Sequence, residues 1–349
     1  QTGLGDLKLS KPIAWQEKDG KKLPVEVSYK LIGKNRYSFE VAKADPSLPI
    51  VIDPILQATY LGGSSKDEAE ALAVHPKTGD VYVAGKTKSI DLPKTAGGAQ
   101  TGCISCINDF PDIFVARLNS DLTQILQSTY LGGRERDEAH AIAIHPVTGE
   151  VYVAGYTYSN DFPKTDGGAR TYNDGDFDVF VARLNKELTQ ILQSTYLGGR
   201  YFDFARALVI HPRTGNVYVA GETKSTSFPK TTGGAQASYG GGDYDAFVAR
   251  LNSNLTQILQ STYLGGSGGD LAYSLAIHPT TGDVYVAGET GSTSFPKTTG
   301  EVQASNGGGI DAFVARPTAD LASASRSSGG GGYHMTGSVS SCGYLSQLL

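Results

Sequence analysis

Apolar residues gather in short runs rich in β-branched and aromatic side chains, and Gly, Pro, Asn and Asp separate these runs. Such runs predict β-strands of about five to eight residues joined by tight turns. In one run, Phe114 and Ala116 would occupy one face of a strand, and Ile113 and Val115 would occupy the other. Because both faces are apolar, we expect each sheet to be packed between two neighbouring sheets.

The runs recur in a fixed order. The string Tyr-Leu-Gly-Gly begins at Tyr60, Tyr130, Tyr196 and Tyr263, a period of about 67 residues. Each period holds an apolar run ending in His-Pro, then Thr-Gly-x-Val-Tyr-Val-Ala-Gly, Phe-Pro-Lys-Thr (Leu-Pro-Lys-Thr in the first), and Asp-x-Phe-Val-Ala-Arg; Ile-Leu-Gln-Ser-Thr-Tyr follows in the first three. Four predicted strands in each of four repeats indicate an all-β fold, a β-propeller over residues 55–320.

The fourth strand of the pattern is displaced along the chain. It follows the third strand in the first three repeats, beginning at Ile125, Ile191 and Ile258, but it is missing after the fourth repeat. A further copy precedes the first repeat, and this assembly strand consists of Ile55, Leu56, Gln57, Ala58, Thr59 and Tyr60. We expect the assembly strand to complete the last sheet. Two arrangements are open: pairing within one chain, which closes a ring, or pairing with a neighbouring subunit, which builds a polymer.

These repeat motifs resemble the bacterial and archaeal beta-propeller repeat family SBBP over about residues 55–320. Pro12–Pro54 also looks like the β-rich region that precedes such repeats in large secreted members. The resemblance implies an extracellular or cell-surface protein with no established catalytic residues, so it transfers no site. The family's name implies seven blades, whereas this sequence contains four repeats.

The flanking segments differ from the repeats. Residues 1–54 are predicted to form a small β-rich unit with turns at Asp19-Gly20 and at Gly33–Asn35. Residues 321–349 are rich in Gly and Ser from Ser323 onward, a composition typical of a flexible tail.

Composition narrows the functional classes. The net charge is −5, and the longest basic cluster, Lys18–Lys22, is interrupted by Asp19, so we expect no nucleic-acid partner. No apolar run reaches the roughly 18 residues of a membrane-spanning helix. The sequence contains no nucleophile elbow, zinc-protease motif or phosphate-binding loop, and we expect neither catalytic residues nor a cofactor.

Two loops carry candidate sites. Cys103 and Cys106 form a Cys-x-x-Cys pair, which favours a local disulfide over a metal or redox site because no second Cys pair exists. Asp174, Asp176 and Asp178 alternate as oxygen ligands of Ca²⁺ do. The competing interpretation of these carboxylates is turn capping and pairing with the repeated Arg residues.

Two further sets of residues bear on function. Four His precede Pro and are interpreted as turn residues: His75, His145, His211 and His278. Several Tyr fall where the repeats differ, mainly between the second and third strands, and could bind sugars or proteins: Tyr156, Tyr158, Tyr172, Tyr201 and Tyr239.

These observations predict a non-enzymatic extracellular structural or interaction protein. It would be a cell-surface component or a filament or sheath subunit that associates with itself through strand complementation. The alternative is a secreted adhesin that recognises glycans or cell-surface proteins through its loops. A hydrolase or lyase using a central channel is a weaker third hypothesis.

Overall fold

The computed structural model describes residues 12–32, 37–53, 57–296 and 302–322. The described residues form strands and a single short 3-10 helix, η1 (Ser105–Asn108). This part of the chain contains no helix with the length and hydropathy needed to span a bilayer. The structure is therefore all-β, as the repeat pattern predicts.

The N-terminal strands form one antiparallel sheet in the order β3-β2-β1-β4. They are β1 (Ile13–Lys18), β2 (Lys21–Leu31), β3 (Tyr37–Ala42) and β4 (Ile50–Asp53). Asp19 and Gly20 join β1 to β2 with φ values of 52° and 73°, the positive pair that a two-residue hairpin turn requires. The second expected turn, Gly33–Asn35, lies outside the described residues.

The repeats form four sheets, numbered here 1 to 4 in chain order, with neighbouring strands antiparallel. Sheet 1 contains β5 (Asp67–Val74), β6 (Val81–Thr87), β7 (Asp112–Leu118) and β8 (Ile125–Leu131). Sheet 2 contains β9 (Asp137–Ile144), β10 (Val151–Thr157), β11 (Asp178–Leu184) and β12 (Ile191–Leu197). Sheet 3 contains β13 (Asp203–Ile210), β14 (Val217–Thr223), β15 (Asp245–Leu251) and β16 (Ile258–Leu264). Sheet 4 contains β17 (Asp270–Ile277), β18 (Val284–Thr290) and β19 (Asp311–Ala315).

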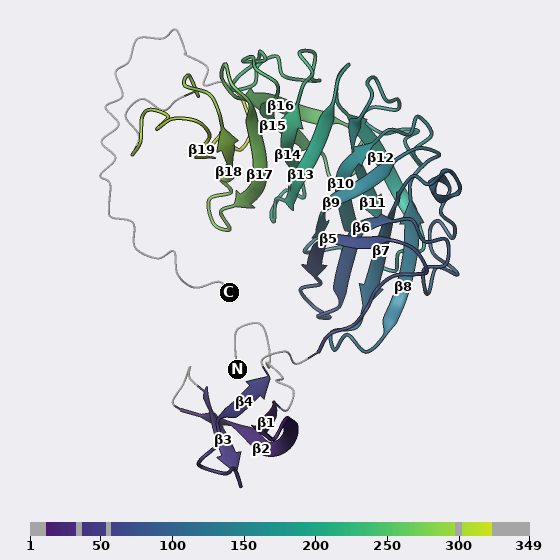
Figure 1. The fold of residues 1–349 in the computed structure, drawn as a ribbon. Helices are drawn as coiled ribbons and strands as arrows, with labels where there is room; N and C mark the ends of the chain where they lie inside the picture. Colours follow the sequence, from purple (N-terminus) through teal and green to yellow (C-terminus); the bar gives the residue numbers. More distant parts are fainter. Residues whose placement is uncertain (1–11, 33–36, 54–56, 297–301, 323–349) are drawn as a thin grey trace.

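The sheets stand side by side along an arc, with the first strand of each sheet on its inner side (Figure 1). Three separate apolar cores lie between sheets 1 and 2, between sheets 2 and 3, and between sheets 3 and 4. Side chains on alternate positions of one strand enter different cores: Tyr152 packs toward sheet 3, and Val151 and Val153 pack toward sheet 1. This explains why the internal strands are apolar on both faces. Sheets 1 and 4 form the two ends of the arc (Figure 1).

A β-bulge interrupts the first strand of every sheet. In sheet 3 the pairing shifts between Ala205 and Ala207, so Arg206 is the extra residue. Gly221 lies opposite, and any Cβ there would clash with the carbonyl oxygen of Phe204. The repeated Val-Ala-Gly of the second strand therefore ends in Gly because the bulge brings backbone against backbone.

The repeat region extends slightly beyond its expected end. Leu321 is fully buried in the core between sheets 3 and 4. Its backbone carbonyl accepts a hydrogen bond of 2.9 Å from the N–H of Ala235. The predicted tail therefore begins after this anchor, and residues 323–349 lie outside the described part of the chain.

Candidate functional site

The outer edge of sheet 4 lacks the fourth strand that sheets 1 to 3 possess. Among the described residues, β19 pairs with β18 and with no further strand. Ile55 and Leu56 of the assembly strand lie outside the described residues. Gln57–Tyr60 belong to no strand and are exposed, with Tyr60 100% exposed. The described residues thus do not pair within the chain in the way that ring closure requires.

The equivalent strands of sheets 1 to 3 have a constant register. Phe114 lies opposite Tyr130, Phe180 opposite Tyr196, and Phe247 opposite Tyr263. Phe313 occupies the same position in β19, opposite Gly288 of β18. By this register Phe313 would face Tyr60, and Val314 would face Thr59.

The Tyr at this position anchors each complete sheet. The Tyr196 hydroxyl donates to the carbonyl oxygen of Ser159 at 2.8 Å and accepts from the N–H of Phe162 at 3.1 Å. Its ring lies against the pair formed by Phe162 and Phe180, whose centroids are 4.6 Å apart. Tyr130 and Tyr263 make the same two hydrogen bonds in sheets 1 and 3. Sheet 4 holds the corresponding ring pair, Phe295 and Phe313, also 4.6 Å apart.

Two buried carboxylates meet at each junction between sheets. One comes from the start of a third strand and the other from the start of the next first strand, and both flank the first Gly of Tyr-Leu-Gly-Gly. A Cβ at Gly265 would lie 2.7 Å from both Asp245 Oδ1 and Asp270 Oδ2. Asp112 with Asp137 and Asp178 with Asp203 flank Gly132 and Gly198 in the same way. All six carboxylates are fully buried.

Burial raises the pKa of the Asp112, Asp137, Asp178, Asp203 and Asp245 carboxyl groups, because desolvation disfavours the charged form, and the paired carboxylate adds repulsion at Asp137, Asp178 and Asp245. The pKa rises to about 8 for Asp137, about 7 for Asp203, Asp178 and Asp245, and about 6 for Asp112. Asp137 Oδ2 accepts hydrogen bonds from the Gly133 N–H at 2.8 Å and the Ser159 hydroxyl at 2.9 Å. These hydrogen bonds hold the Gly-Gly turn against the start of the next sheet.

The bulge residues lie at one constant position of the repeat, yet all four differ: Glu70, His140, Arg206 and Tyr273. The sequence reasoning placed variable functional residues in the loops and missed this row. The sequence feature that could have revealed these residues is a variable position between two small residues in the first strand of each sheet. A bulge turns the extra side chain away from the regular alternation of its strand. Among the positions of the four first strands, this one varies most in sequence.

The charges around the row are paired with one another. Lys86 Nζ lies 3.0 Å from a carboxylate oxygen of Glu138 and 3.0 Å from one of Glu68. Arg206 donates two hydrogen bonds to Glu222 Oε1, at 2.6 and 2.9 Å. The first pair joins sheets 1 and 2, and the pair of Arg206 and Glu222 joins two strands of sheet 3.

His140 is an uncharged member of the row. Burial, together with the positive charge of Arg206, lowers the pKa of His140 to about 4. Its ring stacks on Tyr156 at 5.4 Å between centroids. Tyr156 in turn packs edge-on against Phe204 at 5.0 Å. This part of the row is a packed aromatic cluster.

The Cys pair is joined by a disulfide between Cys103 and Cys106, whose Cα atoms are 5.6 Å apart. Cys103 belongs to an apolar cluster on the outer face of sheet 1, beside Leu92, Phe114 and Tyr130. The disulfide therefore fixes a loop that covers this end of the arc.

The candidate calcium ligands are divided among other partners. Asp178 Oδ2 accepts the Asp174 N–H at 2.9 Å, and Asp174 pairs with Arg170 at 2.8 Å. Asp176 is exposed. Within the described ranges no three His, Cys, Asp or Glu side chains form a group that could hold a metal ion. The hydrogen bond to Asp178 Oδ2 is a turn cap, whereas Asp174 pairs with Arg170 and not with one of the repeated Arg residues.

The His-Pro histidines lie in the turns between first and second strands. His75 Nδ1 accepts the N–H groups of Lys77 and Thr78 at 3.3 and 3.2 Å, and His145 and His211 do likewise in their own turns. These residues cap turns along one rim.

The loop tyrosines divide into two groups. Tyr156 is buried, and the Tyr239 hydroxyl bonds the carbonyl oxygen of Gly242 at 3.0 Å. The exposed members are Tyr158, Tyr172 and Tyr201. Tyr172 borders a hollow of about 780 Å³ that also includes Arg170, Lys230 and Ile258. The Arg170 guanidinium lies over the Tyr172 ring, 4.7 Å from its centroid.

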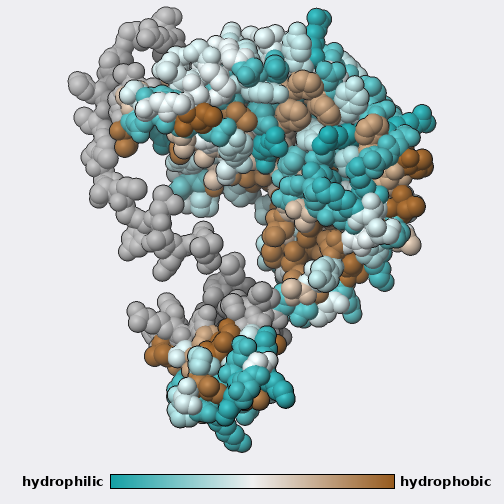
Figure 2. Space-filling view, viewed as in Figure 1, coloured by the Kyte–Doolittle hydropathy of each residue, from teal (hydrophilic) through white to brown (hydrophobic). Residues whose placement is uncertain are grey.

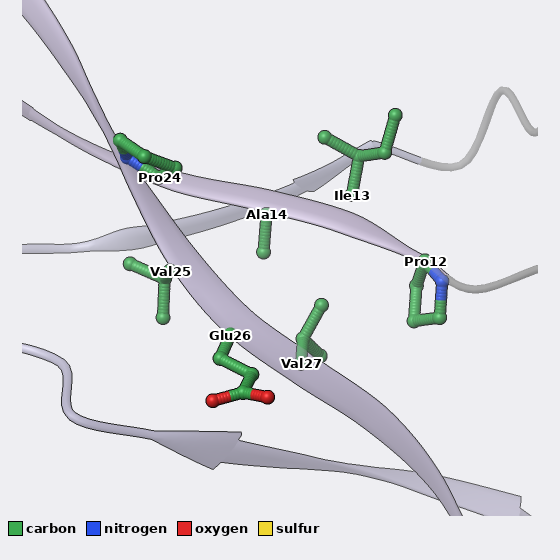
Figure 3. Close-up of a pocket in the computed structure, with 7 residues that line it drawn as sticks. All are labelled: Pro12, Ile13, Ala14, Pro24, Val25, Glu26 and Val27. Atoms are coloured by element: carbon green, nitrogen blue, oxygen red, sulfur yellow. The ribbon is translucent and has the colours of Figure 1, made fainter.

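A second hollow, of about 550 Å³, lies on the N-terminal sheet (Figure 3). It is lined by Pro12, Ile13, Ala14, Pro24, Val25, Glu26 and Val27. Glu26 is the one ionisable side chain among these lining residues.

Comparisons with known proteins agree with the repeat pattern. Residues 128–163 match the family described as Beta-propeller repeat, SBBP, and residues 1–55 match a family described as Domain of unknown function (DUF7948). No curated protein matches the chain.

Two solved structures are similar in part. One is the crystal structure of Chaetomium thermophilum Sqt1, at 14% identity and a TM-score of 0.33, with 65% of this chain and 43% of that chain covered. The other is the same protein bound to the N-terminus of the ribosomal protein L10, at 9% identity and a TM-score of 0.32, with 75% of each chain covered. This chain thus spans less than half of the first structure.

The matched segment begins in β8 of sheet 1 and continues through β9 and β10 of sheet 2. The sequence repeat therefore begins one strand before the sheet does. It starts in the fourth strand of one sheet and continues through the first two strands of the next sheet. The match to the SBBP beta-propeller repeat thus covers residues 128–163 of the chain.

Proposed function

We propose that this protein is a non-enzymatic extracellular structural subunit, with four propeller-type repeats, that assembles by β-strand complementation. One observation carries the proposal: sheet 4 ends at an open strand while Gln57–Tyr60, part of a segment that matches the missing strand, is exposed. In a polymer, the assembly strand of one subunit would complete sheet 4 of the next. Unpaired strand edges recruit strands from other chains.

Two further features support a structural role. The charges beside the bulge residues neutralise one another: Arg206 and Glu222 join two strands of sheet 3, and Lys86 and Glu138 join sheets 1 and 2. The disulfide between Cys103 and Cys106 is of the kind that persists in oxidising, extracellular compartments. Both fit a secreted scaffold better than an enzyme.

The test replaces residues 55–60 with a Gly-Ser linker of equal length and measures particle mass by light scattering. We expect the wild type to form assemblies and the strand-less variant to be a single subunit. A labelled peptide with the sequence of residues 55–61 should then bind that variant with 1:1 stoichiometry. The matched peptide carrying Tyr60→Ala should bind about tenfold more weakly or worse, because it lacks the aromatic anchor.

Either of two results would contradict the proposal. A monomeric wild type that excludes the peptide would mean that the strand closes its own ring. Assemblies of unchanged size without residues 55–60 would mean that another surface holds the subunits together.

The adhesin alternative has one observation in its favour, the hollow beside Arg170, Tyr172 and Lys230. Stacked aromatic and cationic side chains of this kind suit sugars and acidic groups. Binding of the strand-less variant to a panel of immobilised glycans, lost on Tyr172→Ala with the fold retained, would favour this function.

A further inference from the structure

The two ends of the arc carry complementary faces. We infer that sheet 4 of one copy packs on sheet 1 of a second copy, repeating the junctions within the chain. The inference deepens the proposed function and rests on it, because it names the partner as a second copy and specifies the face that is buried. The contact would be head-to-tail, since the two faces differ.

The apolar halves of this junction are exposed at the ends of the arc (Figure 2). Leu72 of β5 is 67% exposed, whereas its equivalents Ile142, Leu208 and Leu275 are buried against the preceding sheet. Val314 of β19 is 76% exposed, and its equivalents Val115, Val181 and Val248 are fully buried against the following sheet. Each end thus presents one half of a core that the chain completes three times internally.

Three further contacts recur at the internal junctions, and the first two are hydrogen bonds. The first is a hydrogen bond from the second-strand Tyr to a loop carbonyl of the following sheet: Tyr82 to Lys186 and Tyr152 to Ser253 at 2.7 Å, and Tyr218 to Ala319 at 2.5 Å. The second joins a loop N–H to the carbonyl of a buried Leu: Ala99 to Leu188, Ala169 to Leu255, and Ala235 to Leu321. The third brings a turn His against a turn Gly of the next sheet: His75 to Gly149, His145 to Gly215, and His211 to Gly282.

The ends hold the matching groups. Tyr285 is only half-buried, and Val302 and His278 are exposed at the sheet 4 end. The equivalent partners at the sheet 1 end are the carbonyl oxygens of Ser120 and Leu122, and Gly79. We therefore expect Tyr285 to donate to Ser120, Val302 to donate to Leu122, and His278 to pack on Gly79 across the copies.

Strand donation brings these two faces together. Six positions separate Leu131, the end of β8, from Asp137, the start of β9, and the same six separate Leu61 from Asp67 at the start of β5. A connection this short places the next first strand beside the sheet that holds the fourth strand, as it does between sheets 1 and 2. A copy that donates residues 55–60 to sheet 4 of its neighbour would therefore deliver its own sheet 1 to the exposed Val314.

The experiment uses one variant for each face of the full chain, Leu72→Glu and Val314→Glu. Both positions are exposed, so both variants should fold and keep the wild-type circular dichroism. Each variant alone should be a single subunit by sedimentation velocity, at concentrations where the wild type assembles. Mixed 1:1, they should form a dimer and nothing larger, because only one intact junction can form between them. Val147→Glu, a substitution at an exposed apolar turn residue of sheet 2, is the matched control and should assemble as the wild type does.

A mixture that stays monomeric overturns the end-face junction, and so does assembly of either single variant. The labelled peptide of residues 55–61 separates this failure from that of the proposed function. If it binds the strand-less protein carrying Val314→Glu while either single variant of the full chain assembles, strand donation holds and the face contact does not. If it binds no form of the protein and the wild type is monomeric, both proposals fail.

Discussion

Substituting Asp137 with Asn should flatten the dependence of stability on pH. Asp137 lies fully buried at the junction of sheets 1 and 2, beside Asp112, and burial raises its pKa to about 8 from an ordinary value of 3.8. The folded protein therefore keeps a proton that the unfolded chain releases above about pH 4. This contribution to stability is complete below pH 4 and is lost as the pH rises toward 8.

The slope in that window is about 1.4 kcal/mol per pH unit for one such carboxyl, so about 2.7 kcal/mol disappears between pH 5 and pH 7. Asn resembles the protonated acid and can still accept from Gly133 and Ser159. We expect Asp137→Asn to be about as stable as the wild type at pH 5 and more stable at pH 7.

The assay is urea denaturation at pH 5, 6, 7 and 8, followed by circular dichroism. The single Trp, Trp15, lies in β1, so its fluorescence would follow the N-terminal sheet and not the repeats. Asp121→Asn, at an exposed loop position, is the control and should keep the wild-type slope. The reasoning is refuted if Asp137→Asn loses as much stability between pH 5 and pH 7 as the wild type does.

Three further predictions concern single contacts. Tyr196→Phe should lower the free energy of unfolding by about 2–4 kcal/mol, because two buried backbone groups lose their hydrogen-bond partner. Tyr60→Phe should leave the free energy of unfolding of an isolated subunit unchanged, because Tyr60 is exposed there. Denaturant titration of the two variants compares these free energies. Gly221→Ala should destabilise by about 3 kcal/mol or more, since its Cβ would strike a backbone carbonyl, and a melting temperature equal to the wild type would contradict the bulge geometry. Replacing both Cys103 and Cys106 with Ser should cost about 2 kcal/mol, checked by denaturation with and without reductant, which should affect only the wild type.

The sequence by itself determined the strands and their grouping. Apolar runs, Gly-containing turns and a period of about 67 residues depend on local conformation, so they are legible without the fold. It also marked residues 55–60 as a copy of the fourth-strand motif, because their sequence is of the same type as those of β8, β12 and β16. The Cys-x-x-Cys spacing allowed a local disulfide, because a separation of three residues can bring two Cα atoms within bonding range, and the lack of a second Cys pair favoured it over a metal site.

The tertiary structure decided which side chains meet. The carboxylates of Asp245 and Asp270 are 25 positions apart and come together only because one sheet ends where the next begins. The row from Glu70 to Tyr273 forms because the same bulge recurs in four sheets. A variable residue between two small ones is visible in the sequence, but the sequence does not show that the four side chains lie side by side. Whether the two ends of the arc meet depends on the small rotation between successive sheets, summed over all of them. Side-chain packing at each junction sets that rotation, and strand propensity does not encode it.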